Sequence, residues 1–195
     1  MDRGRWGLIN CLQENLIERI KQGDSEVFYE LIQPIHADLY RMAYAYVQNE
    51  VDAVDILQQA MIQAFERIDS LKEPSYFKTW MIRIVINCSK TYLAKTKKLD
   101  VTDPLELVDV QVISHTYQEE EIDLWDALQS LEEKYKTVLL LRFYQDYTVP
   151  EVANILDMPL GTVKTNIRRG LMQLKQKLKG VYLDEWLQSV EGNDE

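Results

Sequence analysis

Apolar residues recur at intervals of three and four along most of this chain, and that spacing restricts the fold more than any other feature. Between residues 51 and 68, for example, Val54, Leu57, Met61 and Phe65 follow one another at steps of three, four and four. Such spacing places side chains on one face of an α-helix, where they can be buried together. Only 7 Gly and 5 Pro interrupt the 195 residues. We therefore predict an all-α fold.

Changes in this pattern divide the chain into two small helical domains joined by a flexible linker. The helical spacing fades between residues 99 and 118, where Pro104 and several β-branched residues disfavour a helix. Residues 99–133 also carry eleven Asp or Glu and no Lys or Arg, which favours an extended linker at the start of this stretch. The predicted division is a first domain over 1–98, a linker over 99–118 and a second domain over 119–195.

Local signals place the helices of the first domain. Gly23 ends the first helix, and Asp24 or Ser25 can cap the next. Ser75 is expected to cap the last helix of this domain, in which Trp80 belongs to the buried stripe. Helices are predicted over residues 13–22, 36–47 and 51–68, and one more follows a loop over 69–74. The helix after Asp24 or Ser25 carries Val27, Phe28, Leu31 and Ile32 on one face. The stripe expected in that last helix is Phe77, Trp80, Met81, Ile84 and Val85.

Two capping boxes organise the second domain. Ser130 with Glu133 predicts a helix over residues 131–144, and Thr148 with Glu151 predicts a short helix over 149–156. After a break at 157–158, a longer helix is predicted over 159–179, and a short helix, a turn and a longer helix together form a helix-turn-helix. The buried stripe expected in the longer helix is Val163, Ile167, Leu171, Leu174 and Leu178.

The charge distribution points to a polyanionic partner despite a net charge of −10. Residues 72–98 and 159–179 each carry a net charge of +6, which predicts two local contacts with nucleic acid, or else two solvated helix faces. In the second segment, the N-terminal half of the helix is the part that a recognition helix inserts into the major groove. The residues expected to face DNA there are Thr162, Lys164, Thr165, Arg168 and Arg169.

Three segments resemble the extracytoplasmic-function (ECF) sigma factors, the group 4 members of the sigma-70 family of RNA polymerase. Residues 149–171 resemble region 4.2, and the run 161–165 is the most recognisable part. Residues 52–58, followed by Phe65, resemble region 2.2, and residues 77–87 resemble regions 2.3 and 2.4. Together the resemblance covers about residues 24–98 and 121–178, in the order that the family has.

The resemblance implies an alternative sigma factor that binds core RNA polymerase through the β′ clamp helices and the β flap, and that recognises promoter DNA. It also implies an anti-sigma factor, often membrane-anchored, which could hold the chain at the membrane. Two departures concern Gln59, where the family has an acidic residue, and the end of region 2.4, which has lysines in place of arginines. The polymerase-binding residues implied are Asp52, Asp55, Gln58 and Gln59. The residues implied for the minus-ten element are Tyr76, Arg83, Asn87 and Lys90.

Other classes of function have less support in the sequence. Cys11 and Cys88 are far apart in the sequence, and His36 and His115 are the only histidines that could join them as metal ligands. We therefore expect reduced structural thiols and no metal site. We find no catalytic triad and no phosphate-binding Gly loop, and we expect no enzyme, catalytic residue, cofactor or small-molecule substrate. No apolar run approaches the ~20 residues that span a bilayer, so we expect a cytoplasmic protein with no direct membrane insertion.

Two alternatives to the interpretation as a sigma factor stay open. A stand-alone helix-turn-helix regulator would bind an operator tightly without polymerase, and an interaction protein would occupy the polymerase clamp without opening a promoter. The tail after Lys179 can form one more short amphipathic helix through Tyr182, Leu183, Trp186 and Leu187. Nothing in the sequence indicates what that tail does.

Overall fold

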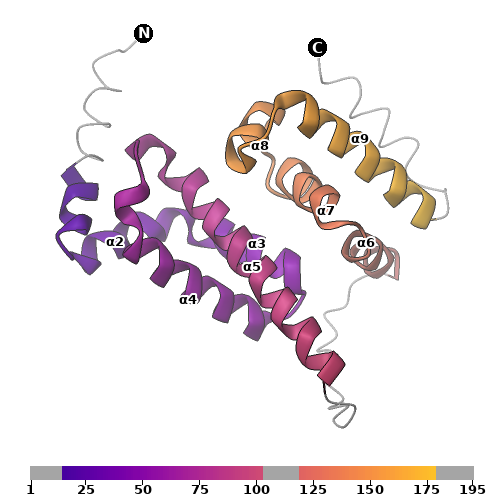
Figure 1. Ribbon diagram of the computed structural model, residues 1–195, viewed down its shortest axis with the longest axis horizontal. Coiled ribbons are helices and arrows are strands. Elements are labelled where there is room, and N and C mark those ends of the chain that lie inside the picture. The colour runs from indigo at the N-terminus through magenta and orange to yellow at the C-terminus, as the bar shows by residue number, and fades with distance from the viewer. Residues whose placement is uncertain (1–14, 103–118, 179–195) are drawn as a thin grey trace. The chain divides into compact units, whose positions relative to one another are not determined.

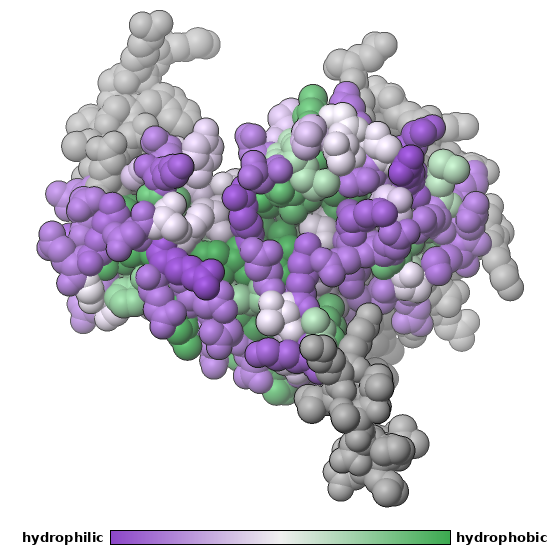
Figure 2. All heavy atoms as spheres, viewed as in Figure 1, coloured by the Kyte–Doolittle hydropathy of each residue, from purple (hydrophilic) through white to green (hydrophobic). Residues whose placement is uncertain are grey.

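A computed structural model describes residues 15–102 and 119–178 of the chain (Figure 1). Every regular element in these two ranges is helical, which confirms the all-α prediction. The helices form two compact units: the first holds those up to residue 102, and the second holds most of those from residue 119 onward. On the face drawn in Figure 2, hydrophilic side chains cover most of each unit. Most of the predicted linker, like Cys11 and the tail, lies outside the described residues.

The first unit contains a helix over residues 15–21 and four longer elements. Gly23 ends the first helix with φ +95, a conformation that favours glycine. Asp24 then accepts a hydrogen bond from the Val27 N–H at 3.2 Å, and this bond, with the Arg19 guanidinium, lowers the pKa of Asp24. The four elements are α2 (Ser25–Ile32), α3 (His36–Val47), α4 (Glu50–Glu66) and α5 (Phe77–Thr102). Short 3-10 turns occupy Gln33–Ile35, Ile68–Ser70 and Pro74–Tyr76.

The core of the first unit lies where α3, α4 and α5 pack against one another. The stripe predicted for α4 was partly wrong, because Val54 is 42% exposed and Met61 and Phe65 are only half-buried. Alanines take their place in the core. Such small side chains allow neighbouring backbones to approach closely, and a pattern built on large apolar residues does not detect them. The buried residues of α4 are Ala53, Ile56, Leu57, Ala60 and Ala64.

The start and the core face of α5 also differ from the prediction. Ser75 does not cap the helix, because it lies inside the 3-10 turn that precedes Phe77. Phe77, Met81 and Val85 are buried as predicted, whereas Trp80 and Ile84 are half-buried. Ile82 and Ile86 are buried in addition, because α5 contacts both α3 and α4 and therefore buries a wider face. The helix continues to Thr102, into the range predicted for the linker.

The second unit is built around the contact between α7 and α9. Ser130 does not form the predicted capping box, because its hydroxyl donates to the Ala127 carbonyl at 2.7 Å at the end of the preceding helix. Thr148 does form one: its N–H donates to Glu151 Oε2 at 2.8 Å. The helices are α6 (Glu119–Gln129), α7 (Glu133–Leu139), α8 (Val149–Leu156) and α9 (Leu160–Lys177), with a π-helical turn over Leu140–Tyr144 after α7.

Candidate functional site

The helix-turn-helix predicted from the sequence is formed by α8, a turn and α9. Asp157 in the turn has φ +53, and Met158 donates its N–H to the Ala153 carbonyl at 3.0 Å, which closes the end of α8. Pro159 precedes the first residue of α9 with an extended backbone, at φ −57 and ψ 138. The turn is therefore short and ordered, and it fixes the direction in which α9 leaves α8.

The N-terminal half of α9 presents most of its polar side chains to solvent, although Asn166 is buried. Thr162, Lys164, Arg168 and Arg169 are exposed, while Val163 is buried. Thr165 is half-buried, and its hydroxyl donates to the Gly161 carbonyl at 2.8 Å. Because that donor is occupied, the Thr165 oxygen can only accept a further hydrogen bond. The exposed face combines two guanidinium groups with one ammonium group.

Close packing behind this face holds α9 on α7. Gly170 is buried, and a Cβ atom added there would lie 3.0 Å from Leu139 Cδ1 and 3.2 Å from Tyr135 Cβ. Leu171 and Leu174 are buried on the same side of α9. The outward direction of the basic side chains therefore depends on a tight contact at position 170, where a larger residue would force Leu139 or Tyr135 to shift.

A second candidate surface lies on α4 and combines acidic, amide and apolar groups. Asp55, Gln58 and Gln59 are exposed, and Asp52 is half-buried. A hydrogen bond from the Tyr92 hydroxyl to the Asp52 carboxylate, together with burial, raises the pKa of Tyr92 to about 12. The Tyr92 hydroxyl on α5 therefore lies close to the Asp52 carboxylate on α4, a proximity that the sequence alone did not indicate.

Three apolar residues of α4 belong to the same surface and were missed by the sequence pattern. Val51 is 69% exposed and Ile62 is 54% exposed, and Val54 lies between them. With Asp55 and Gln58 these residues recur at helical spacing, so they share one face. The spacing alone could have identified this face, but the pattern assigned Val54 to the core.

The residues predicted for a minus-ten contact lie at the start and along one face of α5. Tyr76 is 58% exposed in the turn before the helix. Arg83, Asn87 and Lys90 follow at steps of four and three, which places them on one helix face. Asn87 is exposed, and Arg83 and Lys90 are half-buried. The structure therefore groups three of the four residues by face.

Metal and membrane chemistry find little support in the described part of the chain. No group of three His, Cys, Asp or Glu side chains there is placed to hold a metal ion. Cys88 is buried and unpaired, and burial raises the pKa of its thiol. Within residues 15–102 and 119–178, no helix combines the length and the apolar character needed to cross a bilayer.

Comparison with known proteins decides the family. Residues 31–99 match Sigma-70 region 2 and residues 121–174 match Sigma-70 region 4. The chain is 31% identical to the RNA polymerase sigma factor SigV of Bacillus subtilis (strain 168), over 81% of this chain and 95% of that protein. It is 30% identical to the ECF RNA polymerase sigma factor SigW of the same organism, over 84% of this chain and 95% of that protein. The chain belongs to the ECF sigma factors.

Its function is accordingly that of an alternative sigma factor, which binds core RNA polymerase and directs initiation at specific promoters. In this sigma factor the region 2 match includes α3 and α4 and most of α5, and the region 4 match includes α7 and α8 and most of α9. The three surfaces described above, on α4, α5 and α9, therefore fall within the matched regions.

Solved structures share the fold of this sigma factor. The sigma factor RpoE from Bartonella quintana, solved in complex with the anti-sigma factor NepR, aligns with a TM-score of 0.63 at 20% identity, over 78% of this chain and 96% of that one. CnrH, solved in complex with the cytosolic domain of CnrY, aligns with a TM-score of 0.60 at 20% identity, over 84% of this chain and 94% of that one.

Proposed function

We propose that the α4 surface of this sigma factor docks on the β′ clamp helices of core RNA polymerase. Asp52, Asp55, Gln58 and Gln59 supply an acidic and amide-rich surface, which suits a basic partner. Exposed Val51 and Ile62 add apolar contacts that would be buried on docking. Gln59 keeps the hydrogen-bonding capacity of the acidic residue that is common in the family, but without its charge.

We propose that α5 then captures the minus-ten element as the duplex opens. An unpaired base is stabilised when it stacks on a ring or forms hydrogen bonds along its edge. Tyr76 offers an exposed ring, Asn87 offers an exposed amide, and Arg83 and Lys90 supply positive charge. Lys95 and the lysines after it attract phosphates but lack the planar fork that reads a base with two hydrogen bonds.

We propose that α9 reads the minus-thirty-five element in the major groove. Arg168 and Arg169 are the side chains that can contact guanine O6 and N7 with two hydrogen bonds, while Lys164 attracts phosphates. Thr162 and Thr165 can meet a base edge or a thymine methyl group. The observation that carries the whole proposal is that one chain contains both Sigma-70 regions, in order, with an exposed basic face on the helix-turn-helix.

We further propose that an anti-sigma factor controls this chain, because RpoE, a sigma factor of the same fold, was solved in complex with an anti-sigma factor. CnrH, a second protein of this fold, was solved with the cytosolic domain of CnrY bound. The sigma factor itself would form and break no covalent bond, so it is not an enzyme. It would act in the cytoplasm, where polymerase and promoters are found, and a membrane-anchored anti-sigma factor would hold it at the membrane. Residues 99–118 would be the linker between the domains over 1–98 and 119–195.

Reconstituted transcription with sigma-free core polymerase tests the proposal directly. A library of promoter fragments is transcribed with and without the protein, and we expect transcripts that share a start site and two upstream elements. Arg169→Ala should weaken the selection of the upstream element by roughly tenfold, as loss of a contact with two hydrogen bonds implies. Lys177→Ala, exposed in the last turn of α9, is the matched control.

The same experiment distinguishes the alternatives. Core binding without any start site would support an inhibitor that occupies the clamp. Tight operator binding without core binding would support a stand-alone regulator. Val51→Ser combined with Ile62→Ser should weaken core binding about tenfold, because two exposed apolar contacts are lost. Tyr29→Ser, at an exposed position on α2, should leave core binding unchanged.

A further inference from the structure

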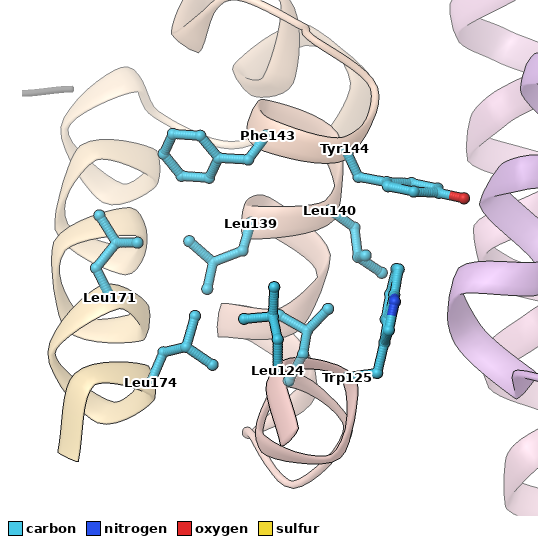
Figure 3. A pocket seen from close by; sticks show the side chains of 9 residues that line it. Leu124, Trp125, Leu139, Leu140, Phe143, Tyr144, Leu171 and Leu174 are labelled. Carbon is cyan, nitrogen blue, oxygen red and sulfur yellow. The ribbon is translucent and has the colours of Figure 1, made fainter. Parts of the chain in front are cut away.

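The second unit contains an apolar groove of about 250 Å³ (Figure 3). Side chains from α6, α7, the π-helical turn and α9 line it, and most of them point toward one another. Leu124 at its edge is 42% exposed, although a leucine in a complete core would be covered. Trp125 and Tyr144 form one wall, with their rings in an edge-to-face contact at 5.4 Å. The lining residues are Leu124, Trp125, Leu128, Leu139, Leu140, Phe143, Tyr144, Leu171 and Leu174.

The volume of the groove suits a large apolar side chain. A cavity of roughly 150 Å³ lined by aliphatic and aromatic residues holds a benzene molecule, so a groove of about 250 Å³ has room for an indole ring. A ring placed there would contact only hydrocarbon on most sides. The groove therefore selects an apolar occupant, and nothing in its lining offers the several convergent polar groups that a small-molecule site requires.

The C-terminal segment, residues 179–195, supplies such side chains, and the described chain before it ends a few residues after Leu174 of the groove. Leu171 and Leu174 belong to the last turns of α9, and the chain leaves that helix only a few residues later. Gly180 can adopt the left-handed conformation that reverses a chain after a helix. In the segment that follows, Tyr182 with Trp186 and Leu183 with Leu187 stand four residues apart, as the apolar face of a helix requires.

The charge distribution also favours a chain that reverses after α9 and lies back along the second unit. Residues 179–195 contain five carboxylate side chains and a single lysine, whereas the last turn of α9 carries Lys175 and Lys177. If the chain reverses after α9, its acidic residues would lie along the basic end of that helix and would be attracted to it. Lysines at a helix C-terminus also interact favourably with the helix dipole. Asp184 and Glu185 lie immediately before Trp186 in the sequence, so a segment that places Trp186 in the groove would also bring these two carboxylates near the basic end of α9.

We propose that residues 179–195 fold back and fill the groove of their own chain, with Trp186 and Leu187 as the buried anchors. The groove is then closed in the free protein. This interaction concerns only the second unit, and it holds or fails independently of the promoter and polymerase contacts proposed above.

Dye binding to the full chain tests this proposal. The probe is 1-anilinonaphthalene-8-sulfonate, which fluoresces on exposed apolar surface. Trp186→Ser combined with Leu187→Ser should raise its fluorescence at least threefold over the unchanged protein, because the groove is opened. Gln188→Ala combined with Ser189→Ala, in the same segment, should leave it unchanged. Adding Leu124→Lys to the first pair should abolish the increase, since a charged side chain then enters the groove.

Hydrogen exchange of the same full-length variants is the second measurement. The Trp186→Ser, Leu187→Ser protein should exchange at least threefold faster across residues 124–144 and at an unchanged rate in α4, which also shows that the first unit remains folded. Equal dye binding and exchange in the variant and the unchanged protein would overturn the proposal. Protection that rises with protein concentration would also overturn it, because the occupant would then be the tail of a second copy.

Discussion

Gly170 offers the sharpest test of how α9 is positioned. In Gly170→Ala the added Cβ atom would lie 3.0 Å from Leu139 Cδ1 and 3.2 Å from Tyr135 Cβ, both closer than ordinary van der Waals contact. Replacing glycine by alanine inside a helix stabilises it by roughly 1 kcal/mol, whereas overpacking costs about 1–3 kcal/mol. We therefore expect Gly170→Ala to destabilise the second unit by about 1 kcal/mol. Gly170→Val, which adds two more carbon atoms, should destabilise it by more than about 2 kcal/mol.

Gly161 provides a matched control on the same helix. A Cβ atom added there has no atom within 4 Å, so Gly161→Ala keeps the gain in helix propensity without the steric cost. We expect it to stabilise the second unit by roughly 0.4–1 kcal/mol. The two variants therefore make the same chemical change with opposite expected signs, and only the packing around position 170 explains the difference.

Hydrogen exchange followed by mass spectrometry on the full chain measures both variants. Peptides from α7 and α9 report the second unit, and peptides from α4 serve as an internal reference for the first. A destabilisation of about 1 kcal/mol corresponds to roughly fivefold faster exchange of the most protected amides. If the amides of α7 are as well protected from exchange in Gly170→Ala as in Gly161→Ala, the contact between α7 and α9 accommodates the added methyl group without loss of stability. That result would show that the reasoning is wrong.

Three further predictions follow from contacts in the two units. Thr148→Ala removes the cap of α8 and should destabilise the second unit by about 1 kcal/mol in urea unfolding, with no change in the first. Asp38 is paired with Lys78 at 2.6 Å, and that hydrogen bond, followed by one from Arg41, lowers the pKa of Asp38. The pair therefore stabilises the first unit at pH values above the ordinary pKa of an aspartate, and this stability is lost as the pH falls through the lowered pKa. Asp38→Asn should therefore lower the unfolding midpoint of the first unit at neutral pH. The difference between the midpoints of the variant and the unchanged protein should become smaller at acid pH. Ala60→Leu should destabilise the first unit by about 1–3 kcal/mol in the same assay, because Ala60 is fully buried, and equal stability would contradict close packing of α4.

The helices were largely predictable because their ends carry specific chemical signals. Gly23 and Asp24 ended one helix and began the next as expected, and Thr148 with Glu151 formed the predicted box. Ser75 was misread because it lies inside a 3-10 turn that precedes Phe77. Ser130 was misread because a serine near a helix end can bond to the backbone of either neighbouring segment. Ser130 bonds backward to Ala127, and the spacing to a glutamate three residues later could not reveal that choice.

The candidate surfaces were predictable to a lesser extent. On α9, Thr162, Lys164, Arg168 and Arg169 are exposed as predicted, whereas Thr165 is half-buried. Asn166 is buried, while Ile167 of the predicted stripe is only half-buried. The contacts of these residues with DNA stay a prediction. On α4 the exposed apolar residues were missed, because burial there is shared among alanines that carry little weight in a hydrophobic pattern. The proximity of Tyr92 to Asp52 was also missed, since these two residues lie on different helices and are 40 positions apart in the sequence. Contacts of this kind depend on tertiary packing.

The π-helical turn over Leu140–Tyr144 has a consequence for the ancestry of this domain. A π turn accommodates one residue more than an α-helical turn of the same span, so it is equivalent to a single inserted residue. Deleting one residue between positions 140 and 144 would restore α geometry, and the side chains before and after the turn would keep their relative directions, because the π turn absorbs the extra residue locally. A relative that is one residue shorter at this point is therefore expected to keep the residues equivalent to Leu139 and Leu171 in the lining of the same groove.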